Sequence, residues 1–176
     1  MPANRITPPW TTWVSALWLA LWLALPAAAE QLNLKDDPQG FGGLAWGTPL
    51  DQTQGLWLAG KDLSLGGLDI YHSEAPRQEF EGVALKKALY VFWRDRFLAV
   101  DLEVEGPEAF AALKKACLDK FGPGFQPQRY LERHYWVGPQ TQASLEYQEV
   151  RQRARLRLHS RELMRQAEEA AKGRRR

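Results

Sequence analysis

Histidine and cysteine are the side chains of this sequence that could bind a metal ion or act as a nucleophile. The three histidines, His72, His134 and His159, have no second histidine at i, i+4 and belong to no Glu-x-x-His motif, so a zinc site is not expected. Cys117, the single cysteine, falls on the apolar face of a predicted helix, which favours a buried thiol over a reactive one. The sequence also lacks a Gly-x-Ser-x-Gly motif and a phosphate-binding glycine loop. We therefore expect no catalytic residue, no metal and no cofactor, and hence no enzyme.

Three acids, Asp101, Glu103 and Glu105, recur at every second position. Paired carboxylates can share general acid and base work, but this spacing on a strand places all three side chains on one face. The residues between them are apolar, as is typical of a strand with one buried face. The pattern predicts an exposed row of acids rather than a catalytic pair.

Arg153, Arg155 and Arg157 form a second charged row, which we call the arginine row, and they alternate with alanine and leucine. One interpretation is a surface that binds anions such as phospholipid headgroups, polysaccharide or nucleic acid. The other is exposed charge that is balanced across the sheet. A two-residue turn at Arg151-Gln152 would place Glu146 opposite Arg157, and the acidic row would offset the arginine row if the two halves of the chain meet edge to edge.

Residues 88–93 read Ala-Leu-Tyr-Val-Phe-Trp and are apolar on both faces of a strand. A two-residue hairpin turn at Arg94-Asp95 places Tyr90, Phe92 and Phe97 on one face, together with Lys86 and two of the acids. An aromatic centre with a polar rim is typical of a contact surface, so these four residues form a candidate partner surface. The alternative is a second core layer, covered by the last helix or by residues 41–46.

The elements that must position these side chains follow from hydrophobic spacing. Alternation predicts strands over 41–46, 68–71, 83–93, 97–105, 134–137, 143–150 and 153–160. Helical spacing and capping residues predict helices over 48–59, 106–121 and 161–172. The order predicts an α+β fold in which an antiparallel sheet of about six strands packs against two or three helices.

A weak internal repeat appears when the sequence is shifted by 56 residues. The shift places Leu89 on Leu145, Val100 on Leu156 and Leu102 on Leu158. The two halves could therefore share a plan of one hairpin followed by one helix. Two units are too few for a solenoid.

The first 29 residues have the features of a secretory signal peptide. Arg5 is their only charged side chain, residues 13–25 are apolar apart from Ser15, and Pro26 ends that run before three alanines. We expect cleavage between Ala29 and Glu30 and hence a periplasmic or secreted protein. The alternative is an uncleaved anchor, but thirteen apolar residues are short for a helix that needs about 20 to span a bilayer.

The remaining sequence reads as one domain. We expect a loose lead-in over 30–40, a single α+β domain over 41–172 and a basic tail over 173–176. The net charge of +2 is too small to indicate a nucleic-acid partner. After cleavage we expect no transmembrane span.

Two motifs resemble those of small, uncharacterised exported bacterial proteins. They are the opening Phe41-Gly42-Gly43-Leu44-Ala45-Trp46-Gly47-Thr48-Pro49-Leu50, and Phe110, Leu113 and Phe121-Gly122 followed by Gly124. In element order, over roughly 130 residues, the chain also resembles the tandem modules of BamE-like lipoproteins and of β-lactamase-inhibitor proteins. That resemblance implies a binding or scaffold module. The chain departs from the former in lacking a lipidated cysteine and from the latter in lacking cysteine pairs, and no binding residue can be carried over.

These features together predict a non-enzymatic protein-interaction module with an envelope protein as its partner. A binder of anions or of the envelope surface, acting through the arginine row, is the first alternative. An enzyme without a recognisable motif is the second.

Overall fold

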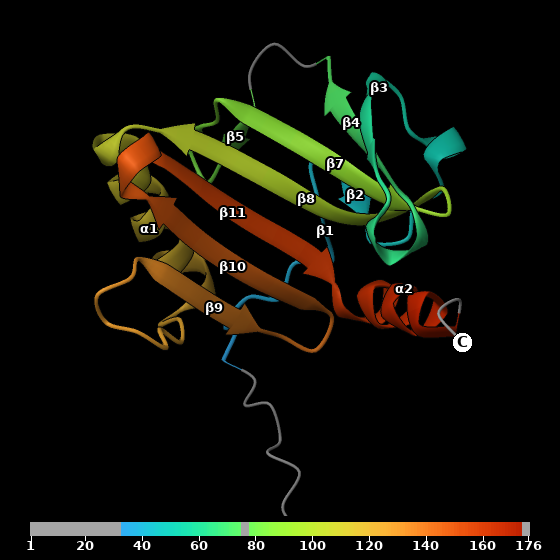
Figure 1. The fold of residues 1–176 in the computed structure, drawn as a ribbon. Helices are drawn as coiled ribbons and strands as arrows, with labels where there is room; N and C mark the ends of the chain where they lie inside the picture. Colours follow the sequence, from blue (N-terminus) through green and yellow to red (C-terminus); the bar gives the residue numbers. More distant parts are fainter. Residues whose placement is uncertain (1–32, 75–77, 174–176) are drawn as a thin grey trace, which may run out of the picture. The chain divides into compact units, whose positions relative to one another are not determined.

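Seven strands form one antiparallel sheet in the order β3-β4-β7-β8-β11-β10-β9 (Figure 1). The computed structural model describes residues 33–74 and 78–173. The strands are β3 (Leu56–Asp62), β4 (Leu68–Ser73), β7 (Lys87–Trp93), β8 (Arg96–Glu105), β9 (Arg133–Val137), β10 (Thr141–Gln148) and β11 (Arg153–Ser160). The predicted α+β fold with an antiparallel sheet is confirmed. The sheet has seven strands where about six were expected.

Two α-helices and several short elements complete the described part of the chain. They are α1 (Pro107–Phe121), α2 (Arg161–Gly173), η1 (Leu50–Gln52), η2 (Ser64–Gly66), η3 (Glu149–Arg151), β1 (Gly40–Phe41), β2 (Leu44–Ala45), β5 (Glu79–Phe80) and β6 (Val83–Ala84). The chain divides into the units Met1–Gln31 and Leu32–Arg176, and all of these elements belong to the second. The predicted signal peptide and residues 174–176 lie outside the described residues. Among the residues described, no helix is long and apolar enough to cross a membrane.

Helix α1 covers one face of the sheet, which we call the α1 face. Its buried side chains are Phe110, Leu113, Cys117 and Phe121, as the helical spacing predicts. They pack on alternate residues of β8 and β11, such as the fully buried Leu102. This layer is the larger of two hydrophobic clusters, and it gives the sheet the apolar side that alternation requires.

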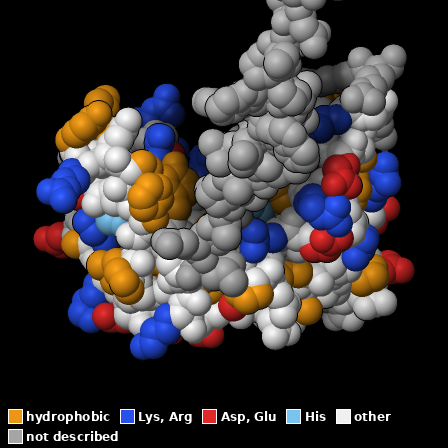
Figure 2. All heavy atoms as spheres, turned by 90° about the horizontal axis from the view of Figure 1, so that it is seen from below, with side chains coloured by type: hydrophobic (Ala, Val, Ile, Leu, Met, Phe, Trp, Pro, Cys, Tyr) orange, Lys and Arg blue, Asp and Glu red, His pale blue; other side chains and the backbone are white. Residues whose placement is uncertain are grey.

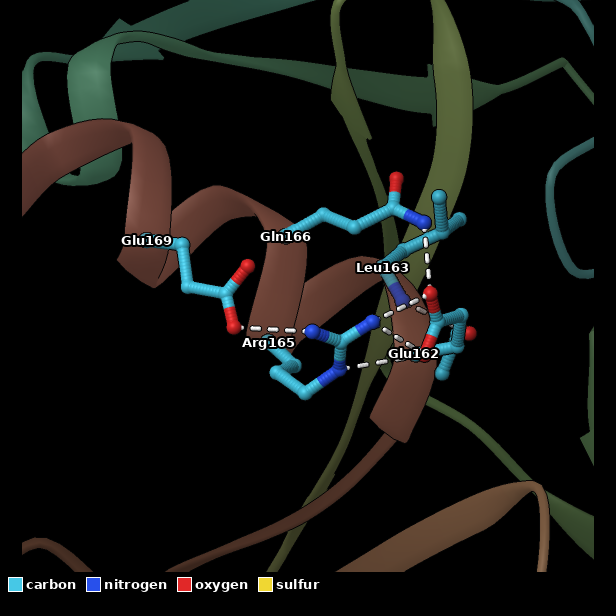
Figure 3. A network of polar contacts seen from close by, with 6 residues as sticks. Glu162, Leu163, Arg165, Gln166 and Glu169 are labelled. Atoms are coloured by element: carbon cyan, nitrogen blue, oxygen red, sulfur yellow. Dashed lines mark hydrogen bonds and ion pairs between the residues drawn. The ribbon is translucent and has the colours of Figure 1, made fainter. Parts of the chain in front are cut away.

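Helix α2 covers one end of the opposite face, which we call the α2 face (Figure 1). Its Leu163 and Ala167 pack on a smaller cluster that includes Val91 and Leu98. Ser160 caps the helix, because its Oγ accepts a hydrogen bond from the N–H of Leu163 at 3.3 Å. The solvent-exposed side of α2 is laced by contacts between side chains three and four residues apart (Figure 3).

The hairpin between β7 and β8 has the predicted two-residue turn. Arg94 and Asp95 both take left-handed conformations, with φ of 50° and 59°, as a type I′ turn requires. Phe92 of β7 lies opposite Phe97 of β8, but the pairing of the two strands shifts by one residue between Phe92 and Val91. This β-bulge places Val100 on the same face as Tyr90, so the predicted assignment of β8 side chains to faces is wrong beyond the bulge.

The predicted helix over 48–59 does not form. The hydroxyl of Thr48 donates to the carbonyl of Ala45 at 2.8 Å, so it does not cap a helix. A short 3-10 turn at Leu50–Gln52 follows, and Gly55 then takes a left-handed conformation with φ of 67°. Residues 56–62 instead pair with β4 as an edge strand, because that pairing satisfies backbone groups that an isolated short helix would leave exposed.

In each half of the chain, strands of the sheet precede one helix: β3, β4, β7 and β8 come before α1, and β9, β10 and β11 come before α2. The two halves meet at the antiparallel pair of β8 and β11. The helices nevertheless cover opposite faces of the sheet. One local difference accompanies this: Gly106, with φ of 93°, separates β8 from α1, whereas α2 follows directly from Ser160.

Candidate functional site

The predicted aromatic partner surface is buried. Tyr90, Phe92 and Phe97 are 6%, 1% and 0% exposed. Residues 40–52 lie across them on the α1 face: the ring of Trp46 is 5.0 Å from Phe97, and the ring of Phe41 is 6.1 Å from Tyr90. The prediction of an open surface at these residues is therefore wrong, and the core-layer alternative is confirmed.

Lys86 does not share that layer. It lies between β6 and β7, is half exposed, and forms an ion pair with Glu105. The bulge in β8 also moves Asp101 and Glu103 to the α2 face, away from Phe92. The mixture of aromatic and charged side chains that suggested an open surface thus belongs to two different faces.

The arginine row lies on the α2 face and is largely balanced by the acidic row. In the β8–β11 register Arg153 is opposite Glu105, Arg155 is opposite Glu103 and Arg157 is opposite Asp101. The guanidinium of Arg155 is 3.4 Å from Glu103, and that of Arg157 is 3.5 Å from Asp101. The interpretation as charge balanced across the sheet is therefore confirmed for Arg155 and Arg157.

Burial shifts two titratable groups in the middle of this face. Desolvation raises the pKa of Asp101, and Arg157 opposes that shift. Desolvation, assisted by Arg157 and Arg161, lowers the pKa of His159 to about 4. The imidazole is therefore neutral near pH 7, and it adds no positive charge to the arginine row.

A small concavity lies at the loop end of the row. The predicted two-residue turn at Arg151-Gln152 is wrong, because a four-residue loop, 149–152, joins β10 to β11. The longer loop shifts the register by two residues, so that Glu146 faces Arg155 rather than Arg157. It also brings Arg151 beside the row, where it lines the concavity with Glu146, Gln148, Arg153 and Arg155. Sequence reasoning missed Arg151 because it placed this residue in the predicted two-residue turn.

One edge of the sheet is sealed. The side chain of Asn33 imitates a strand beside β9: its Oδ1 accepts from the N–H of Val137 at 2.8 Å, and its Nδ2 donates to the carbonyl of Tyr135 at 3.3 Å. Phe125 exchanges two backbone hydrogen bonds with Tyr135, at 2.8 and 2.9 Å. These contacts occupy the outer backbone groups of β9 that would otherwise pair with another chain.

The opposite edge, β3, presents apolar side chains to solvent. Trp57 is 52% exposed and Leu58 is 49% exposed. The indole of Trp57 packs on the ring of His72 at 4.7 Å, which holds it in place. Sequence reasoning missed this edge because it assigned the residues to a helix, although a run of four apolar residues between Gly55 and Gly60 also fits a short strand.

The remaining candidate groups are structural. Cys117 is fully buried, and burial raises the pKa of its thiol to about 12, so the core interpretation is confirmed. His134 is buried and its Nε2 lies 3.3 Å from Glu132. Within residues 33–74 and 78–173, no three histidine, cysteine or acidic side chains come together as a metal site would require.

Elsewhere the surface mixes charges of both signs. Figure 2 shows basic and acidic side chains interspersed, with separate hydrophobic patches, on the side seen from below Figure 1.

Comparison with protein-family models, with curated proteins and with solved structures found no match.

Proposed function

We propose that this chain is an exported, non-enzymatic protein-interaction module whose partner docks an extended segment along the open edge of β3. The observation that carries the proposal is the contrast between the two edges of the sheet. The β9 edge is occupied by Asn33 and Phe125, whereas Trp57 and Leu58 on β3 are each about half exposed.

An open edge strand is suited to an extended peptide. The outward backbone N–H and C=O groups of β3 offer main-chain hydrogen bonds, and the neighbouring side chains add specificity. Trp57 and Leu58 project to opposite faces, since Trp57 pairs with His72 and Leu58 with Tyr71. A bound strand would therefore gain an apolar contact on each side.

Trp57 is well placed to be the main anchor. Its position is held by His72 before a partner arrives, which lowers the entropy lost on binding. Tryptophan is also the residue type that most often dominates interface energetics. Lys61, paired with Asp69 at 3.1 Å, adds a polar rim at the far end of the strand.

The test is to place a photo-crosslinking amino acid at Leu58 and then measure the affinity of the captured partner. Trp57→Ala should weaken binding by about 2 kcal/mol, roughly thirtyfold, because it removes an aromatic anchor. The matched control is Phe125→Ala, since Phe125 is also exposed, at 63%, but lies at the sealed edge. Equal losses in the two variants, or a crosslink that Trp57→Ala leaves unchanged, would reject docking at β3.

Export is the second part of the proposal and has its own measurement. The signal peptide predicted over residues 1–29 implies that mass spectrometry of the exported protein finds Glu30 at its amino terminus. A protein that keeps residues 10–25 and stays in the membrane fraction would instead support the anchor alternative.

The alternative of an anion binder acting through the whole arginine row is less well supported. Arg155 and Arg157 are paired with acids across the sheet. A uniform polyanion track would need those charges free. The charge that remains unbalanced is concentrated at one end of the row.

A further inference from the structure

We infer that the concavity beside Arg151, Arg153 and Arg155 binds a phosphate group. This site is separate from the β3 edge and does not depend on the proposed function. The ligand is defined by its chemistry, which inorganic phosphate and a phospholipid headgroup share.

The backbone brings three guanidinium groups together. Arg153 and Arg155 are two residues apart on β11 and therefore project from the same face of the sheet. Arg151 lies in the loop before them, at the end of the 3-10 turn η3. All three line one concavity of about 60 Å³.

Two nearby acids are held by cations outside the concavity, whereas Glu103 is paired with Arg155 itself. Glu146 lines the concavity, but its carboxylate is 2.5 Å from the guanidinium of Arg133. Glu105 faces Arg153 in the register but pairs with Lys86. Among the residues that the structure describes, neither Arg151 nor Arg153 has an ion-pair partner within 4.0 Å.

The chemistry of these side chains selects an oxyanion. A guanidinium presents its N–H donors in a planar fork that matches phosphate oxygens, and charge-assisted hydrogen bonds of this kind are stronger than neutral ones. Gln148 adds an amide that can donate another hydrogen bond. Arg155, although 3.4 Å from Glu103, is more than half exposed and has further donors available.

Val150 allows the two sources of phosphate to be told apart. It is fully exposed in the same loop, next to Arg151. An apolar side chain beside cations can enter the interface of a bilayer, whereas it contributes nothing to binding of free phosphate. Val150→Ser should therefore weaken binding to vesicles only.

The experiment measures binding of the mature chain to inorganic phosphate by calorimetry and to vesicles of phosphatidylcholine with or without phosphatidylglycerol by co-sedimentation. The test variant is Arg151→Gln with Arg153→Gln. The control is Arg94→Gln with Arg129→Gln, which removes the same charge from exposed positions outside the concavity. We expect the test variant to lose at least about tenfold in affinity for whichever source binds, and the control to change less than about twofold.

Each outcome decides the inference. Binding of phosphate or of phosphatidylglycerol vesicles that only the test variant loses supports the site and identifies its source. Absence of binding to both probes overturns it. An equal loss in both variants also overturns it, because the attraction would then reflect net charge alone. Binding of the β3 partner is measured separately and should be unaffected by Arg151→Gln with Arg153→Gln.

Discussion

His159, a half-buried residue whose Nδ1 atom is buried, shows how a single side chain makes stability depend on pH. Its folded-state pKa, about 4, lies below the ordinary value of 6.5. Between these values the unfolded chain takes up a proton that the folded chain refuses, so stability falls as the pH is lowered from about 6.5 to about 4. Above 6.5 the group is neutral in both states and the effect disappears.

The first residue-scale prediction follows from this shift. His159→Gln should remove a loss of up to about 3 kcal/mol between pH 6.5 and 4, since one pKa unit corresponds to about 1.4 kcal/mol. Urea unfolding across that range measures the slope. The raised pKa of Asp101 acts in the opposite direction, because the folded state then gains a proton more readily than the unfolded state as the pH falls.

An Asp101→Asn background separates the two groups. In that background the free energy of unfolding should fall more steeply as the pH is lowered, because the opposing contribution of the Asp101 carboxyl is gone. The same pH slope with and without His159 would show that the imidazole is already accessible to protons in the folded protein.

At the scale of elements, the important feature is that residues 40–52 cover β7 and β8 on the α1 face. Phe92 touches Phe97 and Tyr71, with ring centroids 5.5 and 5.3 Å apart. Phe92→Ala should leave a cavity and cost about 3–5 kcal/mol, because the surrounding strands cannot collapse into the space.

Thermal or denaturant melts test this prediction. Phe125→Ala is again the matched control, since an exposed phenylalanine should change stability by less than about 0.5 kcal/mol. A Phe92→Ala protein with an unaltered midpoint would mean that the layer over β7 opens in solution.

Local signals explain which elements could be predicted from the sequence. The turn at Arg94-Asp95 and the face of α1 depend on residues close in sequence, and both predictions are confirmed. The bulge after Phe97 has no comparable signal, because a strand of continuous apolar residues fits either register. Residues 48–59 carry a helix-start pattern, but pairing with β4 outweighs it.

The candidate sites were placed wrongly because the predicted strand pairings were wrong by one or two residues. One shifted residue in β8 moved the acids away from Tyr90, and a longer loop after Gln148 moved Arg151 into the concavity. The arginine row is balanced because β8 and β11 are neighbours in the sheet. From the sequence, this balance could be stated only on the condition that the two halves of the chain meet edge to edge. Tertiary pairing therefore decided which charges are paired.

At the scale of the whole molecule, the two proposed binding surfaces lie at the β3 edge and at the concavity beside Arg151. The β3 edge offers apolar contact and backbone hydrogen bonds, and the concavity beside Arg151 offers three guanidinium groups. They differ in physical character, so salt should weaken binding at the concavity and leave the apolar edge largely unaffected. This difference allows the two sites to be assayed in one protein.

The seal on β9 also has a kinetic consequence. Asn33 contacts residues 102 and 104 positions later in the chain, and the indole of Trp46 donates to Thr141 across 95 positions. The chain loses entropy when such a long loop closes, before the contacts between its ends can stabilise it. Folding that depends on contacts of this kind is therefore slow. A nascent chain shorter than 137 residues cannot complete this seal. The β9 edge of the sheet therefore stays open until residue 137 has been synthesised, and export through a narrow channel, as proposed above, could begin on a chain that still lacks this closure.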